Sequence, residues 1–392
     1  MTDSQEAFGL SAAVIQAGGA HWTAGEILQQ PGVWLEIVAA LAAGRSALQG
    51  FLAPLLELPQ LRIVLSGAGT SAYVGECLAP ALTRGLGRRV EAVATTDLVT
   101  SADSYLAAGT PTLLVSFARS GNSPESTAAV DIVQRHVKRC AHLVITCNAQ
   151  GALNRRARNL ANAYTIVLPE ATDDRGFAMT SSFSGMLLAA AAAFGVLSDP
   201  QVAALSRRTR MFIPACRSLL EELVRAQFQR VVYLGSGPLK GFAHEAALKM
   251  LELTDGRVIA AADSTLGFRH GPKTILNAHS LVVLFLCNDP HARRYDLDLV
   301  RELTREAVAG RVITVADAAG AAQPPGDLQL PAAGGAVAAT DLGLCLAYAP
   351  FAQSLAMLQS LSLGISPDTP NAAGTVSRVV QGVTIYPWHE IP

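Results

Sequence analysis

Two stretches of this chain repeat one another at a fixed distance. The segment LRIVLSGAG at residues 61–69 resembles RVVYLGSG at residues 230–237, and each ends in Gly-x-Gly. Gly67 and Gly235 lie 168 positions apart, which is far longer than the period of about 20–50 residues in solenoid proteins. The same displacement aligns residues 113–115 with 281–283 and residues 144–146 with 312–314. Three segments in register predict a duplicated globular domain of about 140 residues.

Within each half, short Val/Ile/Leu runs alternate with Ala-rich helical stretches. In the first half these runs are residues 63–65, 90–94, 113–115, 143–146 and 165–168. Continuous apolar runs indicate strands that are buried on both faces, as in a parallel sheet with helices on either side. The sequence therefore predicts two α/β domains, each a doubly wound parallel sheet flanked by helices.

We expect five parts along the chain. These are an N-terminal helical arm (1–50), a first α/β domain (51–200), a linking helix (201–228), a second α/β domain (229–366) and an extended tail (367–392). Pro31 is expected near the start of a helix, because proline fits the first helical turn. The uncharged stretch 342–366 contains Pro350 and several Gln and Ser residues, so it predicts a buried helix rather than a membrane span.

The composition of the chain indicates which classes of binding partner to expect. Charged residues make up only 16% of the chain, with 30 Lys and Arg against 31 Asp and Glu. This balance leaves no basic excess to neutralise phosphates, so we expect no nucleic acid partner. The low charge content favours extensive buried interface and an oligomer. The six cysteines form no CxxC pair and the N-terminus has no signal-peptide pattern. We therefore expect reduced thiols, no metal, no membrane partner and a cytoplasmic location.

Small and hydroxyl-bearing residues follow two of the predicted strands. Gly67-Ala68-Gly69-Thr70-Ser71 follows the first strand, and the hydroxyl-rich segment 116–126 follows the third. In open parallel sheets, ligands bind beyond the carboxyl ends of the strands. Small residues let the backbone approach a ligand, and a helix N-terminus favours an anion. The two loops together predict a cradle for one phosphate group, which is compatible with helix capping by Ser123 before Pro124.

A dinucleotide site is the alternative for the first loop. Gly67-x-Gly69-x-x-Ala72 fits the GxGxxA form of that fingerprint, and Asp97 is the candidate acid for the ribose. That scheme leaves the second hydroxyl-rich loop without a role, so we favour the phosphate cradle. The chain contains no Gly-Lys-Ser or Gly-Lys-Thr triplet, which excludes a P-loop.

A second set of chemical groups lies in the second half of the chain. Glu245, Lys249 and Glu252 are spaced i, i+4 and i+7, so they share one face of a predicted helix. The intervening residues are apolar or small, and a buried Glu–Lys–Glu face is costly unless it is paired or functional. A solvated ion pair is the alternative. His270 precedes a Gly-Pro turn and carries the group best suited to moving a proton near neutral pH.

Together these residues resemble the sugar isomerase (SIS) domain family of phosphosugar enzymes. The resemblance runs from about residue 50 to residue 390 and is carried by GAGTS (67–71), ARSGNSPES (118–126), HEAALKMLE (244–252) and FRHGP (268–272). Longer strings are similar to the AgaS-type branch: TTDLVT (95–100), DRGFAMTSS (174–182), YDLDL (295–299) and PDTPNAAGTVSRVVQGVTIYPW (367–388). The family implies two flavodoxin-like SIS domains, with the phosphosugar held at the strand ends of the first.

The resemblance also implies roles for particular residues. Phosphate binding falls on Thr70, Ser71, Ser120 and Ser123, with Arg119 and Asn122 adjacent. The sugar hydroxyls are expected to meet the start of a helix at Thr180 and Ser181.

The proton-transferring glutamate of the family falls on Glu252, with Glu245 and Lys249 on further polar positions of the same helix. Glu245 remains the alternative base. The ring-opening histidine falls on His270 and in that family reaches a neighbouring subunit's site, which implies a homodimer or homotetramer. A C-terminal lysine of the related glucosamine-6-phosphate synthase is matched by Gln381, in a tail expected to close on the active site. Glutamine cannot act as an acid, so a step that uses this lysine passes to Lys249 or is absent.

These observations predict a cofactor-independent enzyme that deaminates and isomerises an aminohexose 6-phosphate. The reaction that the resemblance to the AgaS-type branch implies converts D-galactosamine 6-phosphate to tagatose 6-phosphate and ammonia in amino-sugar catabolism. A ketose/aldose phosphate isomerase without deamination is the first alternative, since it would use the same residues. The second is a sugar-phosphate-sensing regulatory module. It is disfavoured because the first 50 residues contain one Arg and no Lys, unlike a basic DNA-binding helix.

Overall fold

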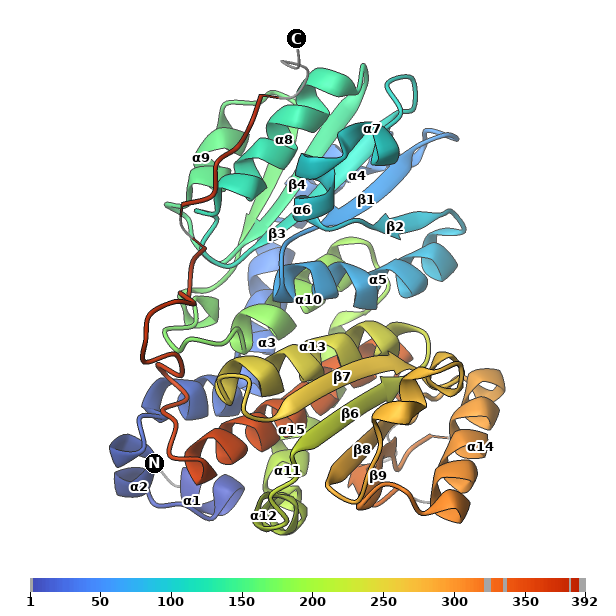
Figure 1. The fold of residues 1–392 in the computed structure, drawn as a ribbon. Coiled ribbons are helices and arrows are strands. Elements are labelled where there is room, and N and C mark those ends of the chain that lie inside the picture. Colours follow the sequence, from blue (N-terminus) through green and yellow to red (C-terminus); the bar gives the residue numbers. More distant parts are fainter. Residues whose placement is uncertain (1–2, 321–325, 334–336, 381, 388–392) are drawn as a thin grey trace.

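The computed structural model of the chain describes residues 3–320, 326–333, 337–380 and 382–387. It contains two parallel five-stranded sheets, ordered β2-β1-β3-β4-β5 and β10-β9-β8-β6-β7. The first comprises β1 (Arg62–Ser66), β2 (Val90–Ala92), β3 (Thr112–Ala118), β4 (Cys140–Thr146) and β5 (Ala163–Val167). The second comprises β6 (Arg230–Gly235), β7 (Ile259–Ser264), β8 (Ser280–Phe285), β9 (Arg311–Asp317) and β10 (Leu328–Leu330). Both sheets have the flavodoxin-like order 2-1-3-4-5, so the predicted fold is confirmed (Figure 1).

The register of the strands tests the sequence repeat. Ile63 pairs with Leu113 in the first sheet and Val231 pairs with Leu281 in the second, which confirms the displacement of 168 for these strands. In the next strand, Leu113 pairs with Ala141 but Leu281 pairs with Arg311. The predicted match of residues 144–146 with 312–314 is therefore wrong by two residues. A shift of two keeps every side chain on the same face of the sheet, so the apolar pattern does not reveal it.

Helices cover both faces of each sheet. In the first domain they are α5 (Thr70–Leu86), α6 (Thr95–Thr100), α7 (Ala102–Tyr105), α8 (Pro124–His136), α9 (Ala152–Arg158), η1 (Glu170–Thr172) and α10 (Ser181–Ala193). In the second they are α13 (Pro238–Leu253), η2 (Gly267–Arg269), η3 (Pro272–Ile275), α14 (Pro290–Glu306) and α15 (Asp341–Ser362). Helices α5 and α10 of the first domain and α13 and α15 of the second lie between the two sheets (Figure 1). One hydrophobic core therefore extends across both domains.

The N-terminal and linking segments are helical. They form α1 (Asp3–Phe8), α2 (Ala12–Ala17), α3 (His21–Ala43), α4 (Arg45–Leu56), α11 (Asp199–Ala215) and α12 (Arg217–Arg225). The expected helix start at Pro31 is wrong, because α3 begins ten residues earlier and contains Pro31 in its interior. A proline leaves the carbonyl four residues before it without its helical donor, and Gln30 Nε2 donates to that carbonyl of Ile27 instead (3.1 Å). The expected single linking helix is two helices that meet just after Pro214.

Helix α15 is long and apolar enough to cross a membrane, but 94% of its apolar window is buried inside the protein. This agrees with the buried helix predicted there. Helices α3 and α4 meet the same criterion only if they are taken as one span, and they are bent by 73°. Among the described residues, these are the helices that pass the test.

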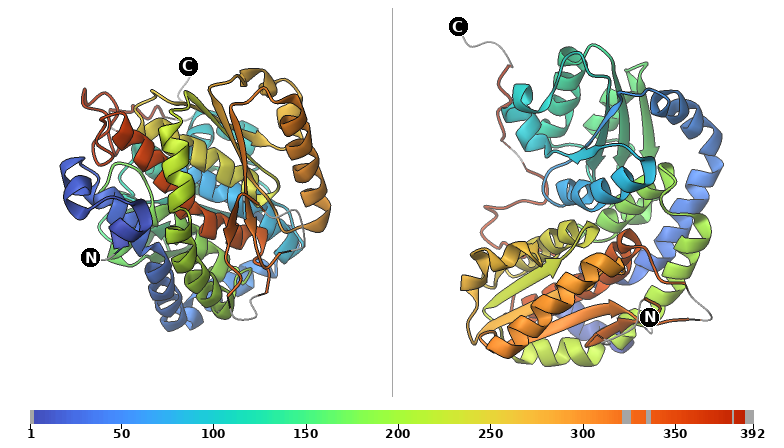
Figure 2. Two further views of the ribbon diagram at one scale, coloured as in Figure 1. Left: turned by 90° about the horizontal axis from the view of Figure 1, so that it is seen from below. Right: turned by 90° about the vertical axis from the view of Figure 1, so that its right-hand side faces the viewer.

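The described part of the C-terminal tail leaves α15 and runs along one edge of the molecule from the second domain to the first (Figure 2). The Asp368 carboxylate accepts hydrogen bonds from the backbone N–H groups of Trp22 (3.0 Å) and Thr23 (2.8 Å). These bonds satisfy free donors at the N-terminus of α3 and fix the start of the tail.

Candidate active site

The two hydroxyl-rich loops begin α5 and α8 at the carboxyl ends of neighbouring strands. Strand β1 pairs with β3, with Ser66 opposite Ser116. Gly69 (φ +56°) and Gly121 (φ +62°) adopt backbone conformations that favour glycine and let each loop turn into its helix. The N-termini of α5 and α8 therefore lie at the same edge of the sheet, where the positive ends of the two helix dipoles favour an anion.

Several predicted phosphate-binding residues also hold the shape of the second loop. The Ser120 carbonyl accepts a hydrogen bond from Asn148 Nδ2 (3.0 Å). Asn122 Oδ1 accepts from the first backbone N–H of α9 (3.0 Å), so this side chain joins the loop to α9. The hydroxyls of Ser123 and Ser126 share a hydrogen bond of 2.7 Å at the start of α8. The loop is thus held by one hydrogen bond within its own segment and by bonds from Asn148 and from the start of α9.

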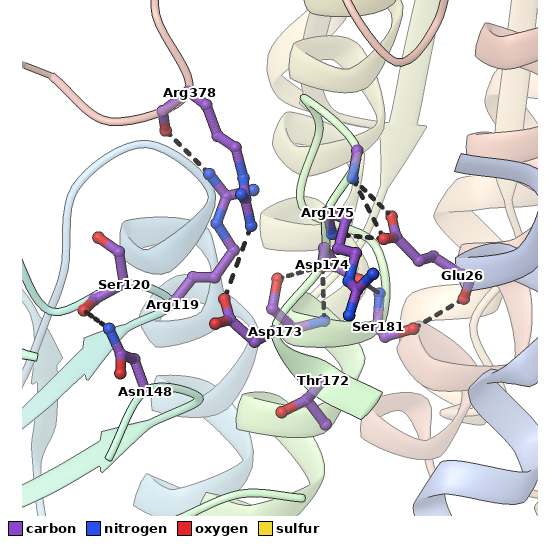
Figure 3. Close-up of polar contacts among 12 residues, drawn as sticks. Glu26, Arg119, Ser120, Asn148, Thr172, Asp173, Asp174, Arg175, Ser181 and Arg378 are labelled. Atoms are coloured by element: carbon purple, nitrogen blue, oxygen red, sulfur yellow. Dashed lines mark hydrogen bonds and ion pairs between the residues drawn. The ribbon is translucent and has the colours of Figure 1, made fainter. Parts of the chain in front are cut away.

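Arg119 lies between this loop and the C-terminal tail (Figure 3). Its buried guanidinium donates to the carbonyls of Phe177 (3.2 Å) and Arg378 (2.8 Å). The Arg378 guanidinium is 3.6 Å from the Asp173 carboxylate. Burial, together with repulsion by Arg378, lowers the pKa of Arg119. The tail therefore brings a second guanidinium close to the predicted phosphate cradle.

Thr180 and Ser181 lie at the start of α10, as predicted, but both side chains are buried and bonded within the protein. Asp174 accepts hydrogen bonds from the Thr180 hydroxyl (3.0 Å) and from the backbone N–H groups of Thr180, Ser181 and Ser182. The Ser181 hydroxyl donates to the Glu26 carbonyl (2.7 Å). A carboxylate of the chain thus occupies the N-terminus of α10, where the sequence places sugar hydroxyls.

Glu26 of α3 anchors the loop that precedes α10 (Figure 3). Its carboxylate accepts from the backbone N–H groups of Arg175 (2.5 Å) and Gly176 (3.1 Å). A Cβ atom at Gly176 would lie 2.9 Å from Glu26 Oε2 and 2.9 Å from Thr23 Oγ1, so only glycine fits without a shift. Burial, and then repulsion by Asp174, raises the pKa of Glu26 to about 7.

Helix α13 brings the predicted Glu–Lys–Glu face to the strand-end loop of the first domain that contains Thr70. Lys249 Nζ donates to Thr70 Oγ1 (2.9 Å), forms an ion pair with Glu252, and lies 3.6 Å from Glu245 Oε1. Lys249 and Glu245 are buried, whereas the Glu252 side chain is 27% exposed. The predicted burial is confirmed for Glu245 and Lys249 but is wrong for Glu252, which is partly exposed, and the alternative of a solvated Glu245–Lys249 pair is wrong.

The two carboxyl groups of this face differ in their electrostatics. Burial raises the pKa of Glu245 to about 8, and Lys249 only partly offsets it. Neither Glu245 oxygen accepts a hydrogen bond from the part of the chain that the structure describes. Burial alone would lower the pKa of Lys249, but the two carboxylates raise it, so the amine is a cation at neutral pH. Glu245 therefore keeps its proton at pH 7, and Glu252 is the carboxyl group of this face that reaches solvent.

His270 and Glu252 do not meet within one chain. Glu252 lies just before β7, whereas His270 follows the other end of that strand and is exposed. A six-residue strand alone separates its ends by about 17 Å. The remaining predicted site residue, Gln381, lies outside the described residues.

In the described part of the second domain, the corresponding strand-end loops face a carboxylate of the chain itself. These loops contain Ser236 and Cys287, and both donate to the fully buried carboxylate of Asp296. The Asp296 carboxylate accepts from the Ser236 hydroxyl (2.5 Å) and from the Cys287 backbone N–H (3.2 Å). It also accepts from the Thr265 hydroxyl (2.9 Å). The fold is duplicated, but this carboxylate would repel a phosphate in the second copy.

Sequence reasoning missed Glu26, Asp174 and Arg378 as residues that shape the site. Asp174 stands six positions before Thr180, which is too far for a standard helix-capping pattern. Arg378 lies in a tail without hydrophobic periodicity. A short polar string, DRGFAMTSS at 174–182, was the available signal for the loop around Asp174.

Two parallel α/β domains, with strand-end loops of one facing a charged helix of the other, define a two-domain protein of the sugar isomerase type. A family model described as the SIS domain matches residues 58–195. A D-galactosamine-6-phosphate deaminase AgaS from Escherichia coli is 45% identical over 371 residues, which is 94% of this chain and 96% of that protein. The protein of the same name from Shewanella sp. (strain ANA-3) is 42% identical, with coverages of 97% and 95%.

A solved structure agrees with these relatives. The crystal structure of tagatose-6-phosphate ketose/aldose isomerase from Escherichia coli matches with a TM-score of 0.85 and 42% identity, covering 94% of this chain and 97% of that one. The chain therefore belongs to the AgaS family of SIS-domain proteins.

Proposed function

We propose that this protein is a deaminating isomerase that converts D-galactosamine 6-phosphate to tagatose 6-phosphate and ammonia. The observation that carries the proposal is the hydrogen bond from Lys249 to Thr70, because it joins the Glu–Lys–Glu face of one domain to the phosphate loop of the other. Glu252, one helical turn from Lys249, then lies beside any sugar whose phosphate occupies that loop. The names of the relatives support the same substrate.

The proposed mechanism assigns the phosphate to the N-termini of α5 and α8, with the hydroxyls of Ser71, Ser120 and Ser123 as donors. His270 of a neighbouring subunit opens the sugar ring and exposes the aldehyde. Glu252 removes the proton from carbon 2 and returns it to carbon 1, and one proton passes from the amine nitrogen to the oxygen on carbon 1, so the amino aldehyde becomes a ketose imine. Water then adds to the imine, and ammonia leaves.

The position of His270 supports an oligomeric enzyme. Since His270 and Glu252 lie at opposite ends of β7 in one chain, a complete site requires His270 from a second copy. We propose a homodimer or homotetramer built in this way. The six free cysteines and a phosphosugar substrate favour the cytoplasm as its location.

A ketose/aldose isomerase that acts on tagatose 6-phosphate is the second candidate, favoured by the name of the solved relative. Both reactions begin with the same proton transfer, so ammonia is the discriminating product. We propose to measure ammonia release from galactosamine, glucosamine and mannosamine 6-phosphates, with isomerisation of tagatose 6-phosphate alongside. Glu252→Gln is the inactive control. Ammonia from galactosamine 6-phosphate supports the deaminase, whereas isomerisation without ammonia from any of the amino sugars would replace it with the second candidate.

A further inference from the structure

A second pair of ionisable groups joins the same two helices further from the phosphate loop. Helices α5 and α13 run antiparallel, so that Lys249 meets Thr70 while His244 meets Glu76. His244 Nδ1 and Glu76 Oε2 are 2.5 Å apart, and their side chains are 27% and 36% exposed. The pair therefore belongs to the domain interface and is also open to solvent.

Tyr73 lies between this pair and the Glu–Lys–Glu face. It is one helical turn from both Thr70 and Glu76 on α5, and its ring centroid is 5.6 Å from that of His244. Burial, and then the carboxylates of Glu76 and Glu245, raises the pKa of Tyr73, so the phenol keeps its proton at neutral pH. One polar stripe thus runs along the two helices from the buried Glu245 and Lys249 to the partly exposed His244.

Deamination requires proton transfers that the carbon-2 step does not. The overall change is R₂C=NH₂⁺ + H₂O → R₂C=O + NH₄⁺, in which both water protons pass from oxygen to nitrogen as the C–N bond breaks. Glu252 handles the carbon-bound proton, and Glu245 is buried without a hydrogen bond from a described residue. His244 lies five residues from Lys249 on α13, about 8 Å along the helix axis. This separation suits transfer through an intervening hydroxyl or water rather than direct contact.

We propose that Tyr73, His244 and Glu76 form a proton relay between the site and solvent that serves the ammonia-releasing half of the reaction. This inference rests on the proposed deaminase function. A proton from the attacking water passes by way of the Tyr73 hydroxyl to His244, and Glu76 stabilises the imidazolium that forms. The same path returns a proton to the departing nitrogen, and the exposed edge of His244 exchanges protons with the buffer. Glu76 and His244 act through Tyr73 and do not touch the sugar.

The alternative is a purely structural contact between the two domains. Loss of such a contact would change substrate binding, carbon-2 proton exchange and ammonia release together. A small base added to the buffer would not restore the lost rate. A relay affects one half only and can be bypassed by a small diffusible base.

The test uses the full-length enzyme with galactosamine 6-phosphate. Carbon-2 proton exchange in deuterated water reports the first half of the reaction, and ammonia release reports the second. In His244→Ala we expect exchange and KM within about twofold of wild type and ammonia release slowed about 10²-fold, which is the lower end of the effect of a general acid–base group. Added imidazole should restore most of the lost rate. His279→Ala, which alters an exposed histidine of the second domain, is the matched control. This variant should release ammonia at the wild-type rate, and added imidazole should not change that rate.

Tyr73→Phe keeps the ring packing but removes the hydroxyl. It therefore tests the relay even if the His244→Ala variant does not fold. It should slow ammonia release and spare carbon-2 exchange. Normal ammonia release in both variants would overturn the relay but leave the proposed deaminase function intact. The same holds if carbon-2 exchange and ammonia release fall equally and added imidazole restores neither. Wild-type enzyme that exchanges the carbon-2 proton but releases no ammonia overturns the proposed function, and the relay with it.

Discussion

Glu245 should give this protein a pH-dependent stability that one isosteric substitution removes. Burial raises its pKa from 4.5 to about 8. The unfolded chain ionises this group above pH 4.5, whereas the folded chain keeps the proton until the pH approaches 8. The contribution of the protonated Glu245 carboxyl to the free energy of unfolding is therefore fully present below pH 4.5. It decreases between pH 4.5 and about pH 8 and is lost at higher pH. At about 1.4 kcal/mol per pH unit, the interval corresponds to roughly 5 kcal/mol.

Glu245→Gln keeps the shape of the side chain and cannot ionise, so it should match wild type in stability near pH 4.5 and exceed it by a margin that grows to about 2 kcal/mol at pH 6 and about 5 kcal/mol at pH 9. The measurement is the melting temperature of both proteins between pH 5 and pH 9, with Glu57→Gln at an exposed position as the control. Wild type and the control should lose stability more steeply than Glu245→Gln as pH rises. Parallel curves would refute a buried, protonated carboxyl at this position. Loss of carbon-2 exchange in Glu245→Gln would move the role of base from Glu252 to Glu245.

Three further predictions concern other parts of the site. Ser120→Ala combined with Ser123→Ala should weaken phosphosugar and inorganic phosphate binding by about 1.5–3 kcal/mol per lost bond, and unchanged titration calorimetry would contradict the cradle. A mixture of inactive His270→Ala and inactive Glu252→Gln chains should recover activity once a tagged pull-down shows subunit exchange; no recovery would place both groups in one chain's site. Glu26→Ala leaves the backbone N–H groups of Arg175 and Gly176 without their acceptor. The free energy of unfolding at pH 6 should therefore fall by about 2 kcal/mol or more, and the KM for the phosphosugar should rise. An unchanged melting curve would count against the anchoring role of Glu26.

The sequence predicted the strands and the two strand-end loops because their signals are local. Continuous apolar runs mark strands that are covered on both faces, and glycines with positive φ mark the turns that follow them. The Glu245–Lys249–Glu252 face follows in the same way from helical spacing, and the structure buries Glu245 and Lys249 of this face while Glu252 stays partly exposed. Pro31 shows the limit of local rules, since a side-chain hydrogen bond from Gln30 compensates the carbonyl it frees and the helix continues through it.

Contacts between distant segments depended on the tertiary structure. The Lys249–Thr70 bond spans 179 positions, and Arg119 meets Arg378 across 259. No periodicity encodes such partners, because they arise where separately folded elements pack. The same holds for Asp174 at the start of α10, which reaches its position through the course of a loop.

Local spacing was enough to predict the duplicated α/β fold, the glycine- and hydroxyl-rich strand-end loops of the first domain and the charged face of α13, since each of these rests on spacing along one element. The packing of the domains set the rest: Glu245 is buried with a raised pKa while Glu252 reaches solvent, His270 lies beyond the far end of β7, and Asp296 accepts hydrogen bonds from the strand-end loops of the second domain. The physical reason is that the electrostatic environment and the available partners of a side chain are set by how deeply the packed domains enclose it. Two glutamates of one helix, seven residues apart, differ in that respect because their domain packs against another.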